Sequence, residues 1–104
     1  MDAEEAVEVF EGLGPVRTRR MFGAVGLFLD GLMFGLLSRG EVFLKADDSL
    51  GEGSRQFAYT RAGKPARLGY WTLPDDALDD PETACDLGRA AVARAVARAE
   101  ARGI

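Results

Sequence analysis

Hydrophobic residues at the start of the chain recur every three or four positions, which is the spacing of one face of an α-helix. Asp2, followed three residues later by Glu5, is the sequence of a capping box at a helix N-terminus. Glycines at positions 12 and 14 and a proline at position 15 would end the helix. We therefore predict an N-terminal helix whose apolar face consists of Ala3, Ala6, Val7, Phe10 and Leu13.

From position 17 to position 46 the apolar period shortens to that of β-strands. Asp30-Gly31 favours a two-residue hairpin, because both central residues of a type I′ turn need a positive φ. With a second turn at residues 38–40, this pattern predicts an antiparallel meander of strands at 18–22, 25–29, 32–37 and 41–45. Strand 25–29 is apolar on both faces, so we expect it near the centre of the sheet, covered by helices on one side and partly covered on the other.

The second half of the chain predicts a short helix, a hairpin and a long helix. The short helix would be capped within residues 47–49, and the hairpin strands would occupy residues 56–60 and 66–73, ending at Pro74. Asp80 and Pro81 suit the cap and the first position of the long helix. The whole pattern indicates a single α+β domain over residues 1–104. The small-residue line of the last helix either packs on its own sheet or forms part of a dimer face: Ala84, Gly88, Ala91, Ala95 and Ala99.

Composition narrows the partners and the compartment. The net charge of −4 and the pI near 4.8 argue against attraction of the whole surface to nucleic acid or anionic lipid. No apolar run approaches the ~20 residues needed to cross a bilayer, and the acidic N-terminus is unlike a secretory signal. Cys85 is the only cysteine and has no partner for an internal disulfide. We expect a cytoplasmic protein with no membrane contact.

The chain offers little catalytic chemistry. It contains no histidine, which removes the commonest general base and metal ligand, and Cys85 has no histidine to activate it. The glycines of residues 23–31 lack the strand-to-helix context of a phosphate-binding loop. An acidic cluster fits a solvated loop leading into a helix cap better than a calcium site: Asp75, Asp76, Asp79, Asp80 and Glu82. We expect no enzyme activity, no cofactor and no metal.

Four stretches of the chain form an ordered set of motifs. They are Arg19-Arg20-Met21-Phe22-Gly23, then Gly26-Leu27-Phe28-Leu29-Asp30-Gly31 with Met33-Phe34, then Val42-Phe43-Leu44-Lys45-Ala46-Asp47, then Gly69-Tyr70-Trp71-Thr72-Leu73-Pro74. The set resembles the hallmark run R-K-M-F-G-G-x-G-L-Y-x-D-G-x-x-F, the L-Y-L-K-x-D strand end and the Y-Y/W-x-x-P strand of the TfoX (Sxy) N-terminal domain family. The resemblance covers nearly the whole chain.

The resemblance implies a helix–strands–helix–strands–helix fold, similar to secretion-chaperone-like domains, and a regulatory role linked to competence and transcription. Ala24 replaces the second glycine of the family's pair and Phe28 replaces its tyrosine, and both changes roughly keep the size of the side chain. Full-length regulators of the family also carry a helical, DNA-binding-like C-terminal domain that these 104 residues do not include. The resemblance therefore implies the fold more directly than a role in competence.

Two functions remain open from the sequence. The first is a non-enzymatic regulatory or protein-interaction module, acting with a protein partner or as a homodimer, because apolar residues point to both faces of the central strands. The alternative is nucleic-acid binding through Arg17, Arg19 and Arg20 with nearby aromatic residues. The candidate interaction residues are those of the family motifs: Arg19, Arg20, Met21, Phe22, Gly23, Gly26, Asp30, Gly31, Phe34, Lys45, Tyr70, Trp71 and Pro74.

Overall fold

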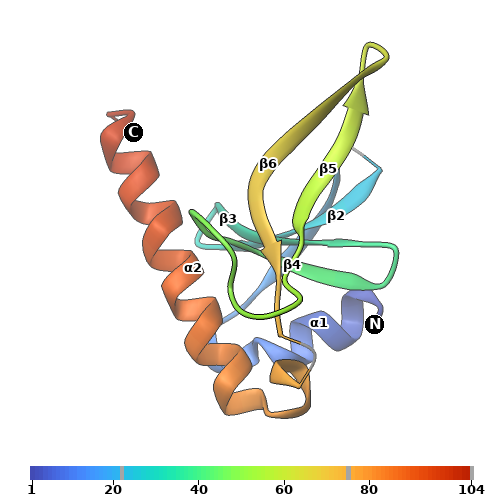
Figure 1. Cartoon of the computed structure of the whole chain (residues 1–104). Coiled ribbons are helices and arrows are strands. Elements are labelled where there is room, and N and C mark those ends of the chain that lie inside the picture. The colour runs from blue at the N-terminus through green and yellow to red at the C-terminus, as the bar shows by residue number, and fades with distance from the viewer. Residues whose placement is uncertain (22, 75, 104) are drawn as a thin grey trace.

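The computed structural model describes residues 1–21, 23–74 and 76–103 and has the predicted α+β architecture (Figure 1). Two α-helices, α1 (Ala3–Val9) and α2 (Pro81–Ala101), accompany one sheet and two 3₁₀ turns, η1 (Glu11–Leu13) and η2 (Ala77–Asp79). The sheet strands are β1 (Arg17–Met21), β2 (Ala24–Leu29), β3 (Leu32–Ser38), β4 (Glu41–Lys45), β5 (Gln56–Arg61) and β6 (Lys64–Thr72).

The N-terminal helix begins as the capping box requires. The Asp2 side chain accepts a hydrogen bond from the Glu5 backbone N–H at 2.9 Å, and the Glu5 side chain accepts one from the Asp2 N–H at 3.4 Å. The α-helical part is shorter than the apolar pattern suggests, because its last turn tightens into η1. Gly14 then turns the chain with a φ of 131°.

The predicted meander is confirmed, since β1, β2, β3 and β4 pair in sequence and antiparallel. β6 pairs with β4, and β5 lies outside it, so the full order is β1-β2-β3-β4-β6-β5. Three connections are two-residue turns in which both central residues have a positive φ: Asp30-Gly31, Arg39-Gly40 and Ala62-Gly63. The last of these corrects the longer loop expected between the strands of the second hairpin.

The prediction of a short helix after Asp47 is wrong. Residues 46–55 form turns instead, in which the Ser49 hydroxyl donates to the Gly51 carbonyl at 2.8 Å. The Ser54 hydroxyl donates to the Thr72 carbonyl at 2.6 Å and ties this segment to β6. Gly51, with a φ of 153°, opposes helix formation there. The short helical turn of the second half is η2, just before α2.

One face of the sheet is covered by both α-helices. The core on this face contains Ala6 of α1 and Phe10, which lies between α1 and η1. Both pack with buried residues of the strands and of α2. The rings of Phe10 and Phe34 meet edge to face with centroids 5.7 Å apart. A Cβ on Gly88 would lie 2.9 Å from Leu13 Cδ1 and 3.1 Å from Phe10 Cδ1, so α2 packs closely on the η1 segment at this glycine. Ala84, Gly88, Ala91 and Ala95 of the small-residue line are buried within the chain, and Ala99 is half-buried.

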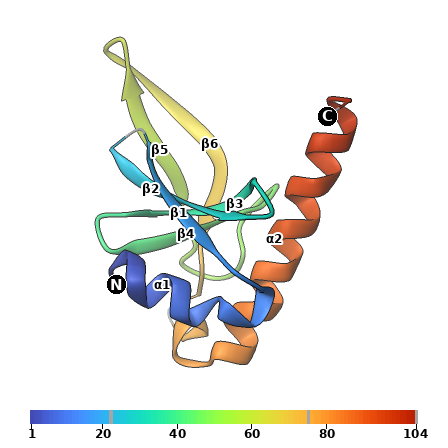
Figure 2. The same cartoon turned by 180° about the vertical axis from the view of Figure 1, so that it is seen from behind.

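The opposite face of the sheet is covered mainly by the sheet's own curvature, and α2 borders it only with its C-terminal turns, near Lys45 and Tyr70. Its buried residues all come from strands: Ala24, Leu36, Phe43, Phe57 and Tyr70. Figures 1 and 2 show the β5–β6 hairpin rising away from the end of the molecule where α1 lies. The prediction that strand 25–29 is covered by helices on one side and partly on the other is confirmed.

Two bulges produce this curvature. In β3, pairing passes from Gly35 directly to Met33, so Phe34 is an extra residue opposite β2. Since side chains alternate along a strand, the insertion sends Phe34 into the helix-covered core and leaves Met33 on the other face. In β6, pairing passes from Trp71 to Arg67, which leaves residues 68–70 opposite Phe57 alone. The second bulge bends the hairpin away from β4.

Candidate functional site

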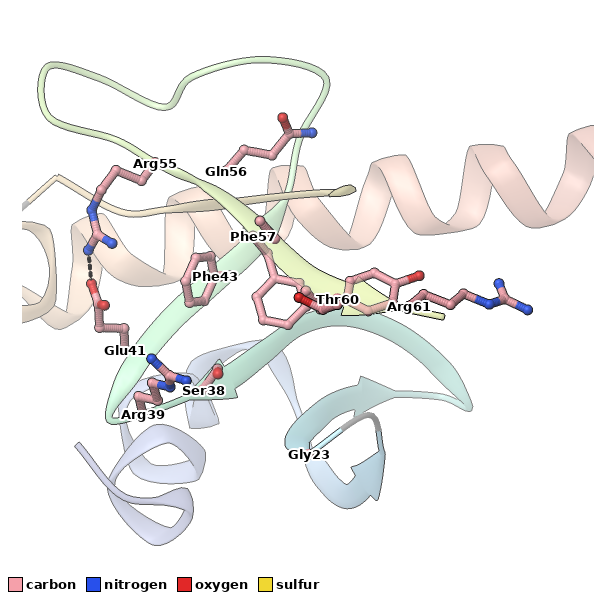
Figure 3. A pocket seen from close by; sticks show the side chains of 12 residues that line it. Gly23, Ser38, Arg39, Glu41, Phe43, Arg55, Gln56, Phe57, Thr60 and Arg61 are labelled. Carbon is pink, nitrogen blue, oxygen red and sulfur yellow. Dashed lines mark hydrogen bonds and ion pairs between the residues drawn. The ribbon is translucent and has the colours of Figure 1, made fainter. Parts of the chain in front are cut away.

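A groove lies on the strand-only face, between β5 and the turns that end β1 and β3 (Figure 3). We call it the β5 groove. It forms because the sheet curls until its edge strand β5 stands opposite the β1–β2 turn, without closing into a barrel. Its lining comes from the two turns, from β4 and from the whole of β5: Gly23, Ser38, Arg39, Glu41, Phe43, Arg55, Gln56, Phe57, Ala58, Tyr59, Thr60 and Arg61.

Aromatic rings form the floor of the β5 groove. Phe43 and Phe57 meet edge to face with centroids 5.2 Å apart, and Tyr59 stacks on Phe57 at 6.1 Å. Phe43 and Phe57 are buried, whereas Tyr59 is half-buried. Such a floor is held in place by its own packing and still offers an apolar surface to a bound chain.

The rim of the β5 groove carries three arginines and one carboxylate: Arg39, Arg55, Arg61 and Glu41. Arg55 and Glu41 form an ion pair whose side chains are 63% and 44% exposed, so it contributes little to stability. Among the described residues, Arg39 and Arg61 have no ion-pair partner. The rim is therefore positive, although the chain as a whole is negative.

The β5 strand presents unpaired backbone groups at the edge of the sheet. Arg61 and Lys64 flank the two-residue turn, so they form the hydrogen-bonded pair that closes the hairpin. Pairing alternates from there, so the N–H and C=O groups of Ala58 and Thr60 point away from β6. In the part of the chain that the structure describes, no strand covers this side of β5. The edge can accept one further strand.

The predicted arginine patch lies at the other edge of the sheet. Arg17, Arg19 and Arg20 are all exposed on β1, where alternation turns Arg20 to the face opposite Arg17 and Arg19. Tyr70, an aromatic residue of the candidate set, is buried on β6, which three strands (β2, β3 and β4) separate from β1 in the sheet order. Phe22, also named as a candidate, lies outside the described residues.

The motif glycines shape the sheet. Gly23 and Gly31 have positive φ values of 73° and 82° in the turns after β1 and β2. A Cβ on Gly26 would lie 3.0 Å from the Sδ atoms of both Met21 and Met33. These positions therefore serve turns and close packing. Two other motif residues differ in exposure, since Asp30 is exposed in its turn and Phe34 is fully buried.

Lys45 and Tyr70 come together on neighbouring strands, with the Lys45 Nζ 4.9 Å from the centroid of the Tyr70 ring. Burial raises the pKa of the Tyr70 hydroxyl, and Arg98 and Arg102 partly oppose that shift. Trp71, next in sequence, has a buried Nε1 for which no described residue is a hydrogen-bond partner. Pro74 packs against Gly51, where a Cβ would approach its Cγ to 3.0 Å. The motif residues therefore occupy several places and form no single site.

The acidic loop before α2 caps that helix. The Asp80 carboxylate accepts hydrogen bonds from the Glu82 N–H at 3.1 Å and from the Thr83 hydroxyl at 2.8 Å. The Thr83 hydroxyl is the main reason why the pKa of Asp80 lies below its usual value. Asp75 lies outside the described residues, and among the others no group of three metal-type side chains converges. Cys85 is buried, with its Sγ 3.3 Å from the Val9 carbonyl oxygen.

Sequence reasoning missed the β5 groove. Its residues come from three separate segments, and only the folded sheet brings Gly23, Arg39 and Phe43 into one groove with β5. The alternation of Phe57 and Tyr59 with Ala58 and Thr60 was a usable signal, because it marks one apolar side of β5.

Comparison with known proteins gives one finding. The family model of the TfoX N-terminal domain matches residues 8–95 of the chain. The match includes every strand of the sheet and most of α2. No curated protein sequence matches. Within the described residues, no helix is both long enough and apolar enough to cross a membrane.

Proposed function

Because the chain belongs to the TfoX N-terminal domain family, we propose that it is a non-enzymatic regulatory module that binds an extended segment of a protein partner in the β5 groove. Family membership supports the regulatory role. The observation that carries the binding mode is the edge of β5, where the outward backbone groups of Ala58 and Thr60 border an aromatic floor.

Strand addition explains how such an edge binds a partner. The added segment exchanges backbone hydrogen bonds with β5, and its alternate side chains enter the groove. Phe43 and Phe57 offer contacts to apolar side chains of the segment. Arg39 and Arg61 favour acidic side chains at its flanks, because neither cation is paired within the described chain. The proposed partner segment is therefore extended, with alternating apolar and acidic residues.

The arginines at the two ends of β5, Arg55 just before the strand and Arg61 at its last position, disfavour self-pairing as the main use of this edge. Two antiparallel copies of β5 centred on Ala58 would place Arg55 of one copy opposite Arg61 of the other. Like charges directly opposite one another destabilise a pair of strands. A segment of a different protein, with carboxylates at those positions, avoids this repulsion.

The test uses a synthetic peptide of alternating apolar and acidic residues and the ¹⁵N-labelled chain. We expect saturable chemical-shift changes at β5 and slowed amide exchange at Ala58 and Thr60, because those N–H groups gain acceptors. Ala58→Pro removes one outward donor without removing a bond to β6, and it should weaken binding about tenfold or more. Ala58→Thr is the matched control, since it keeps the N–H, and it should bind within about twofold of the original chain.

Three results would argue against this function. Equal binding by the Ala58→Pro and Ala58→Thr chains would show that the edge of β5 is not used. Sedimentation that shows a dimer disrupted by Ala58→Pro would make a second copy of the chain the occupant of the groove. Binding to nucleic acid at low salt that is lost when Arg17, Arg19 and Arg20 are replaced would favour the alternative function instead.

A further inference from the structure

A second hollow lies where the C-terminal turns of α2 pass the strand-only face of the sheet, and it shares no lining residue with the β5 groove. Its volume is about 430 Å³, which is within the usual range of small-molecule sites. Apolar side chains, one buried ring and three cations line it, and we call it the Lys45 hollow. The lining residues that matter here are Met33, Leu68, Tyr70, Lys45, Arg98 and Arg102.

The three cations of the Lys45 hollow crowd one another. Burial is the main cause that lowers the pKa of Lys45, and the charges of Arg98 and Arg102 lower it further, while Asp47 alone acts in the opposite direction. The ion pairs of the described chain, Arg55–Glu41 and Arg89–Asp86, both lie elsewhere. These cations are therefore concentrated without a paired carboxylate, in a chain whose net charge is −4.

The α2 helix and β4 hold these charges in place. Arg98 and Arg102 are one helical turn apart, so both side chains leave α2 on the same face. One turn earlier, the Arg94 guanidinium donates to the Lys45 carbonyl oxygen at 3.0 Å and joins α2 to the end of β4. The Lys45 ammonium lies over the Tyr70 ring, which fixes its position further.

Both bulges of the sheet converge on the Lys45 hollow. The β3 bulge turns Met33 to this face, and the β6 bulge spans Leu68 and Tyr70. The Tyr70 hydroxyl donates to the Met33 carbonyl at 3.4 Å and links the two irregular segments. Bulges often lie beside functional sites because they redirect side chains. Here they place an apolar wall opposite the cations.

We propose that the Lys45 hollow binds a small organic phosphate, with its phosphate group among Lys45, Arg98 and Arg102 and its apolar part against Met33 and Leu68. A phosphomonoester carries nearly two negative charges at neutral pH, which suits three convergent cations better than a single carboxylate does. One guanidinium group can donate two parallel hydrogen bonds to two oxygens of the same phosphate. The site is separate from the β5 groove, so the proposal does not depend on partner binding there.

The test is an NMR titration of the labelled chain with phenyl phosphate, compared with inorganic phosphate. We expect phenyl phosphate to saturate one site around Lys45 and Tyr70 and to bind more tightly than inorganic phosphate. The pKa of Lys45 should rise on binding, because the anion stabilises the protonated ammonium. A flat titration, or equal affinity for the two probes, would overturn the proposal.

Substitutions identify the residues that bind. Arg98→Gln and Arg102→Gln should each weaken phenyl phosphate binding about tenfold, since each removes charge-assisted hydrogen bonds. Arg89→Gln removes the same charge from α2 outside the hollow and should leave the affinity unchanged. All three side chains are exposed, so the thermal midpoints should stay close together and show that folding is intact. An equal loss of affinity in Arg89→Gln would show that only the net charge of the chain matters for binding, and it would refute the site.

Phosphate groups could come from a small organic phosphate or from the backbone of a nucleic acid. An oligothymidine without a terminal phosphate distinguishes these two sources. Its diester groups present single charges along a chain, whereas the hollow is proposed to hold one terminal phosphate. Tighter binding of this oligonucleotide through Arg98 and Arg102, with a steep salt dependence, would replace the small-molecule site by a nucleic-acid contact. Binding of phenyl phosphate that outcompetes the oligonucleotide would support the proposal.

Discussion

The two faces of the sheet are stabilised in different ways. Four side chains are the largest that are fully buried, and all of them lie on the face that the helices cover: Phe10, Phe34, Leu27 and Leu44. On the other face, Phe43 and Phe57 remain slightly exposed, and only strands surround them. The comparison indicates that stability resides mainly on the helix-covered face. The strand-only face keeps open surface that a partner can use.

The largest expected effect is on the helix-covered face. Phe10→Ala should lower the free energy of unfolding by about 5 kcal/mol, because it leaves a cavity where α1, β3 and α2 meet and no solvent can fill it. Chemical denaturation would measure the loss. Val96→Ala on exposed α2 surface is the control, with an expected change below about 0.5 kcal/mol. A loss for Phe10→Ala under about 2 kcal/mol would contradict the assignment of the main core to this face.

The corresponding change on the strand-only face should cost less. Phe57→Ala should lower the free energy of unfolding by about 3 kcal/mol, at the lower end for such truncations, because the curled hairpin can settle onto Phe43. Hydrogen exchange should then accelerate in β5 and β6 before it does in β2 and β3. If Phe57→Ala destabilised the whole chain as much as Phe10→Ala, the two faces would form one cooperative core.

Gly35→Ala tests the spacing between β3 and β4, the strands that separate the two faces. A Cβ at this position would lie 2.9 Å from the Phe43 carbonyl oxygen and 3.0 Å from Leu44 Cδ2. Since the first of these atoms belongs to the backbone, β3 and β4 would have to separate, at a cost of about 2 kcal/mol. Thermal unfolding of the Gly35→Ala chain, compared with that of the original chain, would measure this cost. A neutral result would mean that the sheet tolerates wider strand spacing than the structure suggests.

The smallest effect concerns pH and the start of α2. The pKa of Asp80 is lower in the folded chain than its ordinary value. This carboxylate therefore stabilises the fold fully at pH values above the ordinary pKa. The contribution is lost as the pH falls through the folded-state pKa. Asp80→Ala should therefore reduce stability at neutral pH and flatten its decline in acid. Thermal midpoints measured from neutral to acid pH would test this, and parallel curves for the two chains would contradict it.

The local pattern of residues predicted most of the fold. The caps at Asp2 and Asp80, the turn at Asp30-Gly31 and the meander all depend on neighbours in sequence, and all are confirmed. The short helix after Asp47 was wrong because hydrogen bonds from Ser49 and Ser54 favour turns there, and the bond from Ser54 goes to a distant strand. The sequence did not reveal that bond.

The β5 groove and the Lys45 hollow could not be predicted from the sequence as fully as the fold. Lys45 and Tyr70 were singled out from the sequence, but Arg98 joins them only because α2 crosses the sheet at a particular height. The bulges at Phe34 and at residues 68–70 decide which face Met33 and Tyr70 reach. A single inserted residue reverses the side-chain alternation, and alternation alone does not show where such a reversal occurs.

The strand order also has a consequence for how the chain folds. Three hairpins closed by two-residue turns can form early, because their contacts lie close together in sequence and little chain entropy is lost. Only the pairing of β4 with β6 skips a strand, and α2 must then reach back to β3 and β4. The rate-limiting step of folding should therefore be the joining of the four-strand meander, the second hairpin and α2, rather than the formation of any one of them.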